Sequence, residues 1–485
     1  MRFLFIVLFF VFQVNINIFG QNPGFKNLYA GETTGATFVD ILWDGEKLVT
    51  TGQFLTDTAS HGALNGLLYM ELDTNGNSLH TDIYFEPNDG ISSSIGNSVA
   101  QTSNGKIFVM TQPLESTDAL LCIYQNGARI SSIHYQFPAL NTTLRYLKDA
   151  DDQIFLSGHF QNLDYTLEGF LIKADQNGNK IWAKYYGTPG IQTNFVEPFI
   201  IDNNTILIPG GQTNWDPSGS ILNTWTKSYI LSVDSTGTKK SEWVSPENVE
   251  NGIATRLQRL ANGNWLYATY EFIPLPGQIN DWGAKPKLVC RDSNFNLVWE
   301  RYLSDFVSKT NRISDINPTP DGNYVLVGRW DYYNYNVIHK FKSDGTPVWT
   351  YYDACSTLGC DENLGGVTVL PSGSVFIAGD LTNYEIPKSF GLIIKLDQNG
   401  CLDSLTCGPT IGTEEHNLVN KIKVYPNPTT GLVYINKPIG NTVALFNILG
   451  QEIKEEEIVS SKHTLDLSSL DPGVYLIKMH NKKLH

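Results

Sequence analysis

Asp175-Gln-Asn-Gly-Asn-Lys-Ile-Trp182 reads as the end of one β-strand, a tight turn and the start of the next strand. Asparagine and glycine suit such a turn because they adopt positive φ at little cost. The same turn recurs six more times, with its glycine, or one phenylalanine, at positions 76, 127, 237, 295, 345 and 400. A spacing of 50–59 residues between copies indicates a structural repeat.

A second turn lies between successive copies, as at Asn104-Gly105 and Asp321-Gly322, and a short β-rich run follows it. Each repeat therefore contains four strands joined alternately by tight turns and longer loops. Four strands per repeat are typical of a propeller blade, so the chain is predicted to be all-β, with a seven-bladed β-propeller over residues 24–407. A β-helix or a stack of sandwiches is the competing interpretation, but neither alternates tight and long connections at this period.

The start of the propeller is predicted to complete its last blade. Residues 24–30 resemble the fourth strands of the repeats, such as 181–187, whereas residues 401–407 would make a poor strand. We therefore expect residues 24–30 to supply the outer strand of the seventh blade, because this closes the ring and hides an exposed edge. The first strands of the blades are then expected near residues 36, 96, 143, 195, 253, 312 and 364.

Residues 1–20 have the features of a secretory signal peptide, with Arg2 before an apolar core and Gly20 before the expected cleavage point. The formal net charge is −15 and there are no basic clusters, which argues against nucleic acid as a partner. We expect a monomer, with no cofactor and no metal.

Six cysteines fit an oxidising compartment. Two close pairs are predicted to form local disulfides: Cys355 with Cys360, and Cys401 with Cys407. A four-cysteine metal site is the alternative, but neither pair has the Cys-x2-Cys spacing of such sites. Cys122 and Cys290 occupy equivalent places in two separate blades and are predicted to be buried thiols.

The longer loops of a propeller share one face, and loops on a rigid scaffold often carry function. In the fourth, fifth and sixth blades these loops are rich in aromatic residues: Trp215, Trp225, Trp282, Trp330, Tyr332 and Tyr333. Aromatic rings with polar neighbours suit sugar rings or a protein partner. The alternative is that these side chains fold back and pack their own loops.

No catalytic motif stands out in the sequence, which favours a binding module for polysaccharide or protein over an enzyme. The alternative function is a glycoside hydrolase or polysaccharide lyase, whose acids would lie in the same loops: Asp216, Asp281 and Asp331. The Asp-x-Asn-Gly turns resemble the start of a calcium-binding loop. They lack its downstream bidentate acid, so we interpret them as turns.

The C-terminal end carries three blocks in a fixed order: Val424-Tyr-Pro-Asn-Pro-Thr-Thr-Gly431, Val443–Gln451 and Leu465–Lys478. Together they resemble the type A sorting domain of the type IX secretion system, here over residues 421–485 after a polar linker at 408–420. The resemblance implies a small Ig-like β-sandwich. Its matching positions are Pro426, Asn427, Pro428, Gly431, Gly450, Pro472, Gly473 and Tyr475.

That resemblance also implies a route: the signal peptide leads to the periplasm, and the sorting domain then directs export across the outer membrane through the type IX machinery. The cargo would be released or fixed at the cell surface. The turn-plus-tryptophan repeats resemble the secreted propellers of Bacteroidetes and, more distantly, quinoprotein blades. They depart from the Asp-box of sialidases, which argues against that activity.

Overall fold

The computed structural model describes two parts of the chain, residues 24–402 and 423–481. Within them it leaves out the following stretches: 31–33, 57–64, 87–90, 93–98, 114–115, 138–140, 151, 163–165, 203, 215–224, 247–251, 275–281, 305–306, 308–310, 331–335, 354–359, 385–387, 426–428, 430, 437–440, 448–450, 458–461 and 471–474. The chain divides into two compact units, Met1–Gly408 and Pro409–His485. The predicted signal peptide and linker lie outside the described residues.

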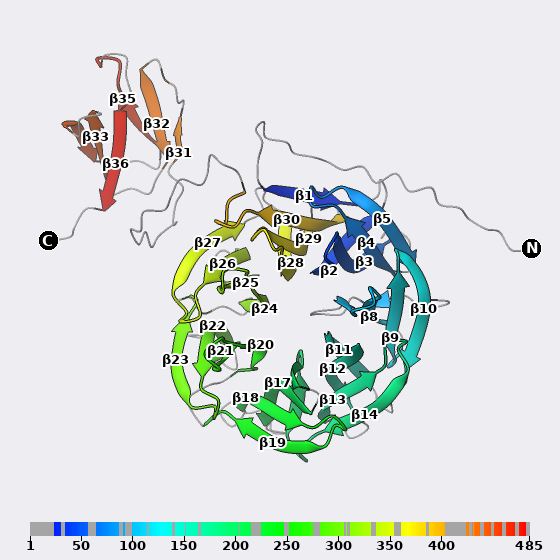
Figure 1. Cartoon of the computed structure of the whole chain (residues 1–485). Coiled ribbons are helices and arrows are strands. Elements are labelled where there is room, and N and C mark those ends of the chain that lie inside the picture. The colour runs from blue at the N-terminus through cyan, green and yellow to red at the C-terminus, as the bar shows by residue number, and fades with distance from the viewer. Residues whose placement is uncertain are drawn as a thin grey trace, which may run out of the picture. The chain divides into compact units, whose positions relative to one another are not determined.

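Seven antiparallel sheets follow one another around a ring in the first unit (Figure 1), which confirms the seven-bladed propeller. From the axis outward, the first three blades contain β2 (Gly35–Trp43), β3 (Leu48–Leu55), β4 (Asn65–Leu72) and β5 (Ser78–Tyr84); β6 (Ile91–Ser92), β7 (Val99–Gln101), β8 (Ile107–Pro113), β9 (Ala119–Gln125) and β10 (Ala128–Tyr135); and β11 (Asn141–Ala150), β12 (Gln153–Gln161), β13 (Leu167–Ala174) and β14 (Lys180–Tyr186).

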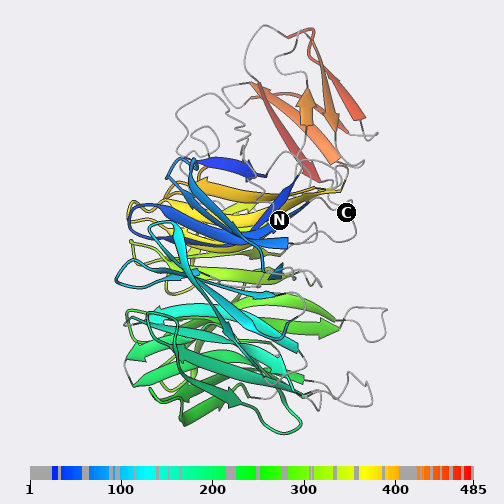
Figure 2. The ribbon, with the colours of Figure 1, turned by 90° about the vertical axis from the view of Figure 1, so that its right-hand side faces the viewer.

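The remaining blades have the same order, and their strands run across the thickness of the ring (Figure 2). They contain β15 (Gln192–Phe195), β16 (Phe199–Asp202), β17 (Thr205–Asn214), β18 (Trp225–Val233) and β19 (Lys239–Val244); β20 (Thr255–Arg259), β21 (Trp265–Pro274), β22 (Trp282–Arg291) and β23 (Leu297–Tyr302); β24 (Arg312–Pro318), β25 (Tyr324–Arg329), β26 (Asn336–Phe341) and β27 (Pro347–Asp353); and β28 (Cys360–Val369), β29 (Val375–Asn383) and β30 (Lys388–Leu396).

The seventh blade takes its outer strand from the start of the propeller, as predicted. Strand β1 (Phe25–Tyr29) pairs antiparallel with β30, from Phe25 opposite Lys395 to Tyr29 opposite Gly391. Lys26 also contacts Asp353 of blade 6 at 2.8 Å and Glu362 of its own blade at 2.7 Å. The ring is therefore closed by backbone pairing and by ion pairs between residues more than 320 positions apart in the sequence.

The repeated turn that identifies the blades is stabilised by its own first residue. In blade 1, Asp73 Oδ1 accepts hydrogen bonds from the backbone N–H groups of Asn75 and Asn77, both at 2.8 Å. The turns that begin at Asp175, Asp234, Asp292 and Asp397 repeat this arrangement. These carboxylates therefore act as turn residues, as the sequence indicates.

The same turns also join neighbouring blades. Gly76 has a φ of 80°, and an added Cβ would lie 2.7 Å from the ring of Phe25 in β1, so glycine is required both by conformation and by space. Tyr29 of β1 donates a hydrogen bond to the Gly76 carbonyl at 2.6 Å. Tyr135 and Tyr186 make the same bond to the turn glycine of the following blade.

Blade 5 has a phenylalanine at the glycine position of this turn. Phe295 takes a φ of 62°, a conformation that non-glycine residues rarely adopt. Its ring stacks on Trp243 of the preceding blade, with centroids 5.5 Å apart, and on Trp265 at 6.1 Å. Aromatic stacking between blades thus offsets the backbone cost of losing the glycine.

The core is divided among the contacts between blades. Seven hydrophobic clusters of the described residues each lie between two neighbouring blades, and each combines residues from both sheets. Cys122 and Cys290 are buried free thiols in two of these clusters, which confirms that prediction. Cys360 and Cys401 are both disulfide-bonded. Their predicted pairing with Cys355 and Cys407 stays a prediction, because those two positions lie outside the described residues.

The second unit contains two three-stranded antiparallel sheets. One is formed by β31 (Lys423–Tyr425), β32 (Leu432–Asn436) and β35 (Lys462–Asp466), and the other by β34 (Glu452–Glu457), β33 (Asn441–Asn447) and β36 (Tyr475–Asn481). Val443 and Leu445 of one sheet share a small core with Leu465 of the other. The Ig-like topology expected here stays a prediction. Across the described parts of both units there is no helix long and apolar enough to span a membrane.

Candidate functional site

The innermost strands of the propeller share an irregularity that brings side chains to the axis. Strand pairing shifts register between Phe38 and Asp40 in β2, and the same kind of shift occurs in β11, β20, β24 and β28. In blade 4 the innermost strand is interrupted between β15 and β16. Bulges of this kind re-aim side chains. Here they carry the ionisable groups described next.

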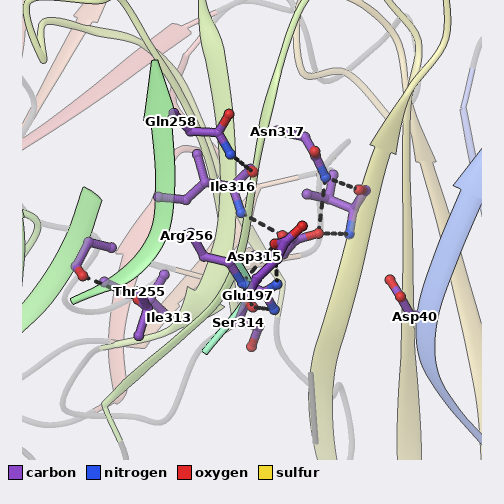
Figure 3. Close-up of polar contacts among 12 residues, drawn as sticks. Asp40, Glu197, Thr255, Arg256, Gln258, Ile313, Ser314, Asp315, Ile316 and Asn317 are labelled. Atoms are coloured by element: carbon purple, nitrogen blue, oxygen red, sulfur yellow. Dashed lines mark hydrogen bonds and ion pairs between the residues drawn. The ribbon is translucent and has the colours of Figure 1, made fainter. Parts of the chain in front are cut away.

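A chain of ion pairs connects the innermost strands of blades 3 to 6. Figure 3 shows its members from blades 4 to 6, Glu197, Arg256 and Asp315. Lys148 of β11 lies 3.0 Å from Glu197, which stands between β15 and β16. The other oxygen of Glu197 lies 3.2 Å from Arg256 of β20, and Arg256 Nε lies 3.4 Å from Asp315 of β24. Four blades are thus joined by alternating positive and negative side chains.

We call Lys148, Glu197, Arg256 and Asp315 the axial network, and Arg256 is at its centre. Its side chain is 2% exposed, and its Nε also donates a hydrogen bond to the Ser314 carbonyl at 2.7 Å, with a second bond from Nη2 to the same oxygen. Its φ of 56° is unusual for a residue with a side chain. The surrounding bonds hold this conformation, which directs the guanidinium between the acids of the blades on either side.

Asp40 in blade 1 and Asp315 in blade 6 occupy equivalent positions, and each accepts a backbone hydrogen bond from the next blade. Asp315 Oδ2 accepts the backbone N–H of Val367 in the next blade at 3.0 Å, and Asp40 Oδ2 accepts that of Val99 at 3.1 Å. Asp40 lies to one side of the ion-pair chain, on the strand of blade 1 (Figure 3). Each carboxylate therefore links its own innermost strand to that of the next blade.

The environments of these acids differ. Burial opposes ionisation of Glu197, yet Lys148 and Arg256 together hold its pKa below the ordinary value. Burial raises the pKa of Asp315, although Arg256 opposes the change. Burial, followed by the like charge of Asp315, raises the pKa of Asp40 to about 8. The environment of Asp40 therefore favours holding a proton near neutral pH.

The axial network can hold blades together and retain a proton at Asp40. Its cations and anions are engaged with one another, which is the pattern of a structural network more than of a reaction centre. In the described parts of the chain, no group of three or more His, Cys, Asp or Glu side chains is placed to hold a metal ion.

Of the predicted aromatic loop residues, two open strands, one lies in the core, and three lie outside the described residues. Trp225 opens β18 opposite Asn214, and Trp282 opens β22 opposite Pro274, so both stand at the start of the third strand in adjacent blades. Trp330 is 4% exposed and packs in the core between blades 5 and 6, as the packing alternative describes. Trp215, Tyr332 and Tyr333 lie outside the described residues, as do the alternative acids Asp216, Asp281 and Asp331.

In the second unit, two of the predicted motif positions can be described. Gly431 accepts a hydrogen bond from the Leu467 backbone N–H at 2.8 Å, and an added Cβ would lie 3.2 Å from Ser468. Tyr475 opens β36 and packs against the small core. Both contacts are consistent with roles in the fold of the unit. The other positions lie outside the described residues: Pro426, Asn427, Pro428, Gly450, Pro472 and Gly473.

Fold and tail together define an exported seven-bladed propeller protein. Residues 423–485 match the family model described as a secretion system C-terminal sorting domain. This domain directs the protein through the type IX secretion system to the cell surface or the extracellular space. No curated protein matches the chain.

Several solved structures are similar to this chain. An α-L-arabinanase from Penicillium chrysogenum, complexed with arabinobiose, has 12% identity and a TM-score of 0.43, covering 63% of this chain and 93% of that one. A protein of unknown function from Dyadobacter fermentans has 10% identity and a TM-score of 0.44, covering 79% and 98%. An apocarotenoid oxygenase from Synechocystis has 10% identity and a TM-score of 0.45, covering 76% and 91%. At these levels the likeness concerns the fold alone.

Sequence reasoning missed the axial network, although a signal for part of it exists. In three repeats an acid stands two residues after an apolar residue of the first strand, in Phe38-Val-Asp40, Phe195-Val-Glu197 and Ile313-Ser-Asp315. Aligning these strands would have shown equivalent acids that face the axis. Lys148 and Arg256 have no such counterparts, so their partners emerge only from the packing of the blades.

Proposed function

We propose that this protein is an exported binding module that engages a polysaccharide or a surface protein. The binding region is the face that carries the longer loops of blades 4 to 6. The observation that carries this proposal is the placement of Trp225 and Trp282, which open the third strands of adjacent blades and border two predicted aromatic loops. Export to the cell surface supports it, because such a module meets its ligand outside the cell.

The surroundings of Trp225 suit this role. Lys227 lies two residues further along the same strand, on the same face, with its Nζ 4.6 Å from the centre of the indole ring. The facing strand contributes Asn214, the register partner of Trp225, and Gln212, the register partner of Lys227, on that same face. An indole face bordered by amide and ammonium groups provides apolar area with hydrogen-bonding groups around it, as sugar rings and protein side chains require.

The test compares the full chain with a variant in which Trp215, Trp225 and Trp282 are all changed to alanine. Both proteins are incubated with a panel of insoluble and immobilised polysaccharides, and the retained fraction is measured. We expect the variant to lose at least tenfold in affinity for the retained ligand, since removing buried aromatic contacts typically costs more than about 1.4 kcal/mol. Tyr384→Ala is the matched control, because Tyr384 is a 66% exposed aromatic beside the corresponding loop of blade 7.

The enzyme alternative is tested in the same tubes. A glycoside hydrolase would release reducing ends, and a polysaccharide lyase would release unsaturated products. Product release that disappears in Asp216→Asn, Asp281→Asn or Asp331→Asn would replace the binding module by an enzyme. Retention without product supports the binding module. Retention that is unchanged by the triple tryptophan substitution would overturn the proposed binding region.

A further inference from the structure

Two arginines face each other on the innermost strands of blade 6. Arg312 opens β24 and Arg329 ends β25, and the two residues are register partners in the antiparallel pair. Like charges placed directly opposite one another on a sheet are destabilising. The two arginines also lie on the face of the propeller that carries the longer loops. The first strand of a blade starts on this face and the second strand ends on it.

Both guanidinium groups converge on one neutral oxygen of blade 7. Arg312 Nη2 donates to Asn363 Oδ1 at 2.6 Å, and Arg329 Nη1 donates to the same atom at 3.0 Å. The amide of Asn363 in turn donates to Asp380 Oδ2 at 3.3 Å. An amide oxygen between two cations neutralises neither of them, so the repulsion between the arginines is only partly relieved.

The acids nearby are divided unequally between the two arginines. Asp361 lies 2.8 Å from Arg329 Nη2. Among the described residues, Arg312 has Asn363 as its hydrogen-bond acceptor and has no carboxylate within ion-pair distance, and its side chain is exposed. Arg329 Nε is buried and has no acceptor in the same part of the structure. The cluster therefore contains a buried donor without an acceptor, whereas the cations of the axial network are paired with acids.

We propose that Arg312, with Arg329 and Asn363 behind it, binds a carboxylate group of an acidic ligand, of the class represented by a uronic acid unit of a polysaccharide. A planar guanidinium presents two parallel N–H donors that match the two oxygens of a carboxylate. This inference rests on the proposed binding function and adds the charge of its ligand. It places an anion where the innermost strands of blades 6 and 7 begin, on the face of the aromatic loops.

The electrostatics of the cluster agree with this assignment. The guanidinium of Arg312 is partly desolvated by its surroundings, although the residue is exposed. This desolvation, followed by the like charge of Arg329, lowers the pKa of Arg312 from its ordinary value, while Asp380 and Asp361 oppose the shift. Burial raises the pKa of Asp380 to about 6, so this acid gives less compensation than a fully ionised one when the pH falls toward 6. An incoming carboxylate would relieve the repulsion between the arginines and supply Arg312 with a partner of opposite charge.

A structural role is the competing explanation, and Arg312 distinguishes the two. A purely structural arginine would be expected to be buried and paired with acids, as Arg256 is. Arg312 is exposed and its acceptor is neutral. Its removal leaves the pair between Arg329 and Asp361 in place. The test therefore uses Arg312, whose substitution does not leave a buried charge without its partner.

The experiment measures binding of trigalacturonate, trimannuronate and neutral galactotriose to the full chain by calorimetry. We expect at least one of the uronate trimers to bind more tightly than galactotriose, and Arg312→Gln to weaken that binding at least tenfold. Arg312→Lys, which keeps the charge but loses the fork, should fall between the two. The matched control is Arg301→Gln, which removes an exposed arginine of β23 whose Nε contacts the Asp344 carbonyl, and it should leave binding unchanged.

The inference is overturned if neither uronate trimer binds, or if Arg312→Gln and Arg301→Gln bind the acidic trimer equally well. These results are distinguishable from failure of the proposed aromatic region. Loss of binding in Arg312→Gln but not in the triple tryptophan variant keeps the carboxylate site and rejects the aromatic region. The reverse pattern keeps the aromatic region and rejects the carboxylate site.

Discussion

Arg256 and Arg312 lie on the innermost strands of adjacent blades, yet their surroundings are opposite. Arg256 is 2% exposed and lies between Glu197 and Asp315. Arg312 is exposed and shares the oxygen of Asn363 with a second arginine. A buried guanidinium is tolerated only with acids around it, whereas an exposed one can remain unpaired at modest cost. The axis of the propeller therefore uses arginine to join blades, and its loop face leaves arginine available to a ligand.

The largest change in stability is expected when Arg256 of the axial network is replaced. Arg256→Met keeps much of the side-chain volume but removes the positive charge beside Asp315 and the bonds to the Ser314 carbonyl. Leaving a buried carboxylate without its cation typically costs about 3–5 kcal/mol. We expect the free energy of unfolding, measured by urea titration, to fall by that amount.

The control for this variant is Arg301→Gln on the surface, which should change the free energy of unfolding by less than about 0.5 kcal/mol. Arg256→Lys should fall between them, because it keeps the charge and loses the planar donors. Equal stability of Arg256→Met and Arg301→Gln would mean that the axial ion pairs contribute nothing to the free energy of unfolding. Arg256 would then have no structural role that distinguishes it from Arg312.

A smaller effect is expected from the acid of blade 1. The pKa of Asp40 is raised from 3.8 to about 8, mainly by burial, with contributions from Asp315 and opposition from Arg256. A raised pKa in the folded state means that the contribution to stability is fully present below the unfolded value. This contribution is lost as the pH rises from the unfolded pKa of 3.8 to the folded pKa of about 8. The slope is up to about 1.4 kcal/mol per pH unit.

Asp40→Asn isolates this dependence, because asparagine resembles the protonated acid in shape and charge. We expect the unfolding free energy of the natural protein, relative to the variant, to decrease as the pH is raised from 5 to 8. Glu197 changes stability in the opposite direction because its folded pKa is lowered, but it is present in both proteins and cancels in the difference. Parallel curves for the two proteins would show that Asp40 is ionised in the fold at all these pH values.

The sequence predicts the propeller well because its signals are local. A tight turn needs its aspartate and glycine within a few residues, and the repeat of that turn determines the number and order of the blades. The closing strand at residues 24–30 is also predictable, since it resembles the fourth strands of the repeats. The buried thiols Cys122 and Cys290 follow from their place in a third strand.

The arginine pair could not be predicted from the turn alone. Pro318 opposes Tyr324 and Asp315 opposes Val327, so a regular hairpin would place Arg312 opposite Trp330. The shift in register between Ile313 and Asp315 moves Arg312 by one position, so that it faces Arg329 instead. Such a bulge depends on packing at the axis, which the sequence of one blade does not contain. The same packing buries Trp330, which the loop composition had suggested as a binding residue.

The smallest change in stability is expected when Arg312 on the loop face is replaced. Arg312→Gln removes one of two facing positive charges and leaves the ion pair between Arg329 and Asp361 intact. We expect the free energy of unfolding, measured by urea titration, to stay within about 0.5 kcal/mol of the natural protein, with any change toward greater stability because a like-charge repulsion is relieved. A loss of more than about 1 kcal/mol would give Arg312 the same structural role as Arg256. Unchanged stability together with weaker binding of a uronate trimer would separate the two arginines by function, because the same side chain would then be dispensable for the fold and required for the ligand.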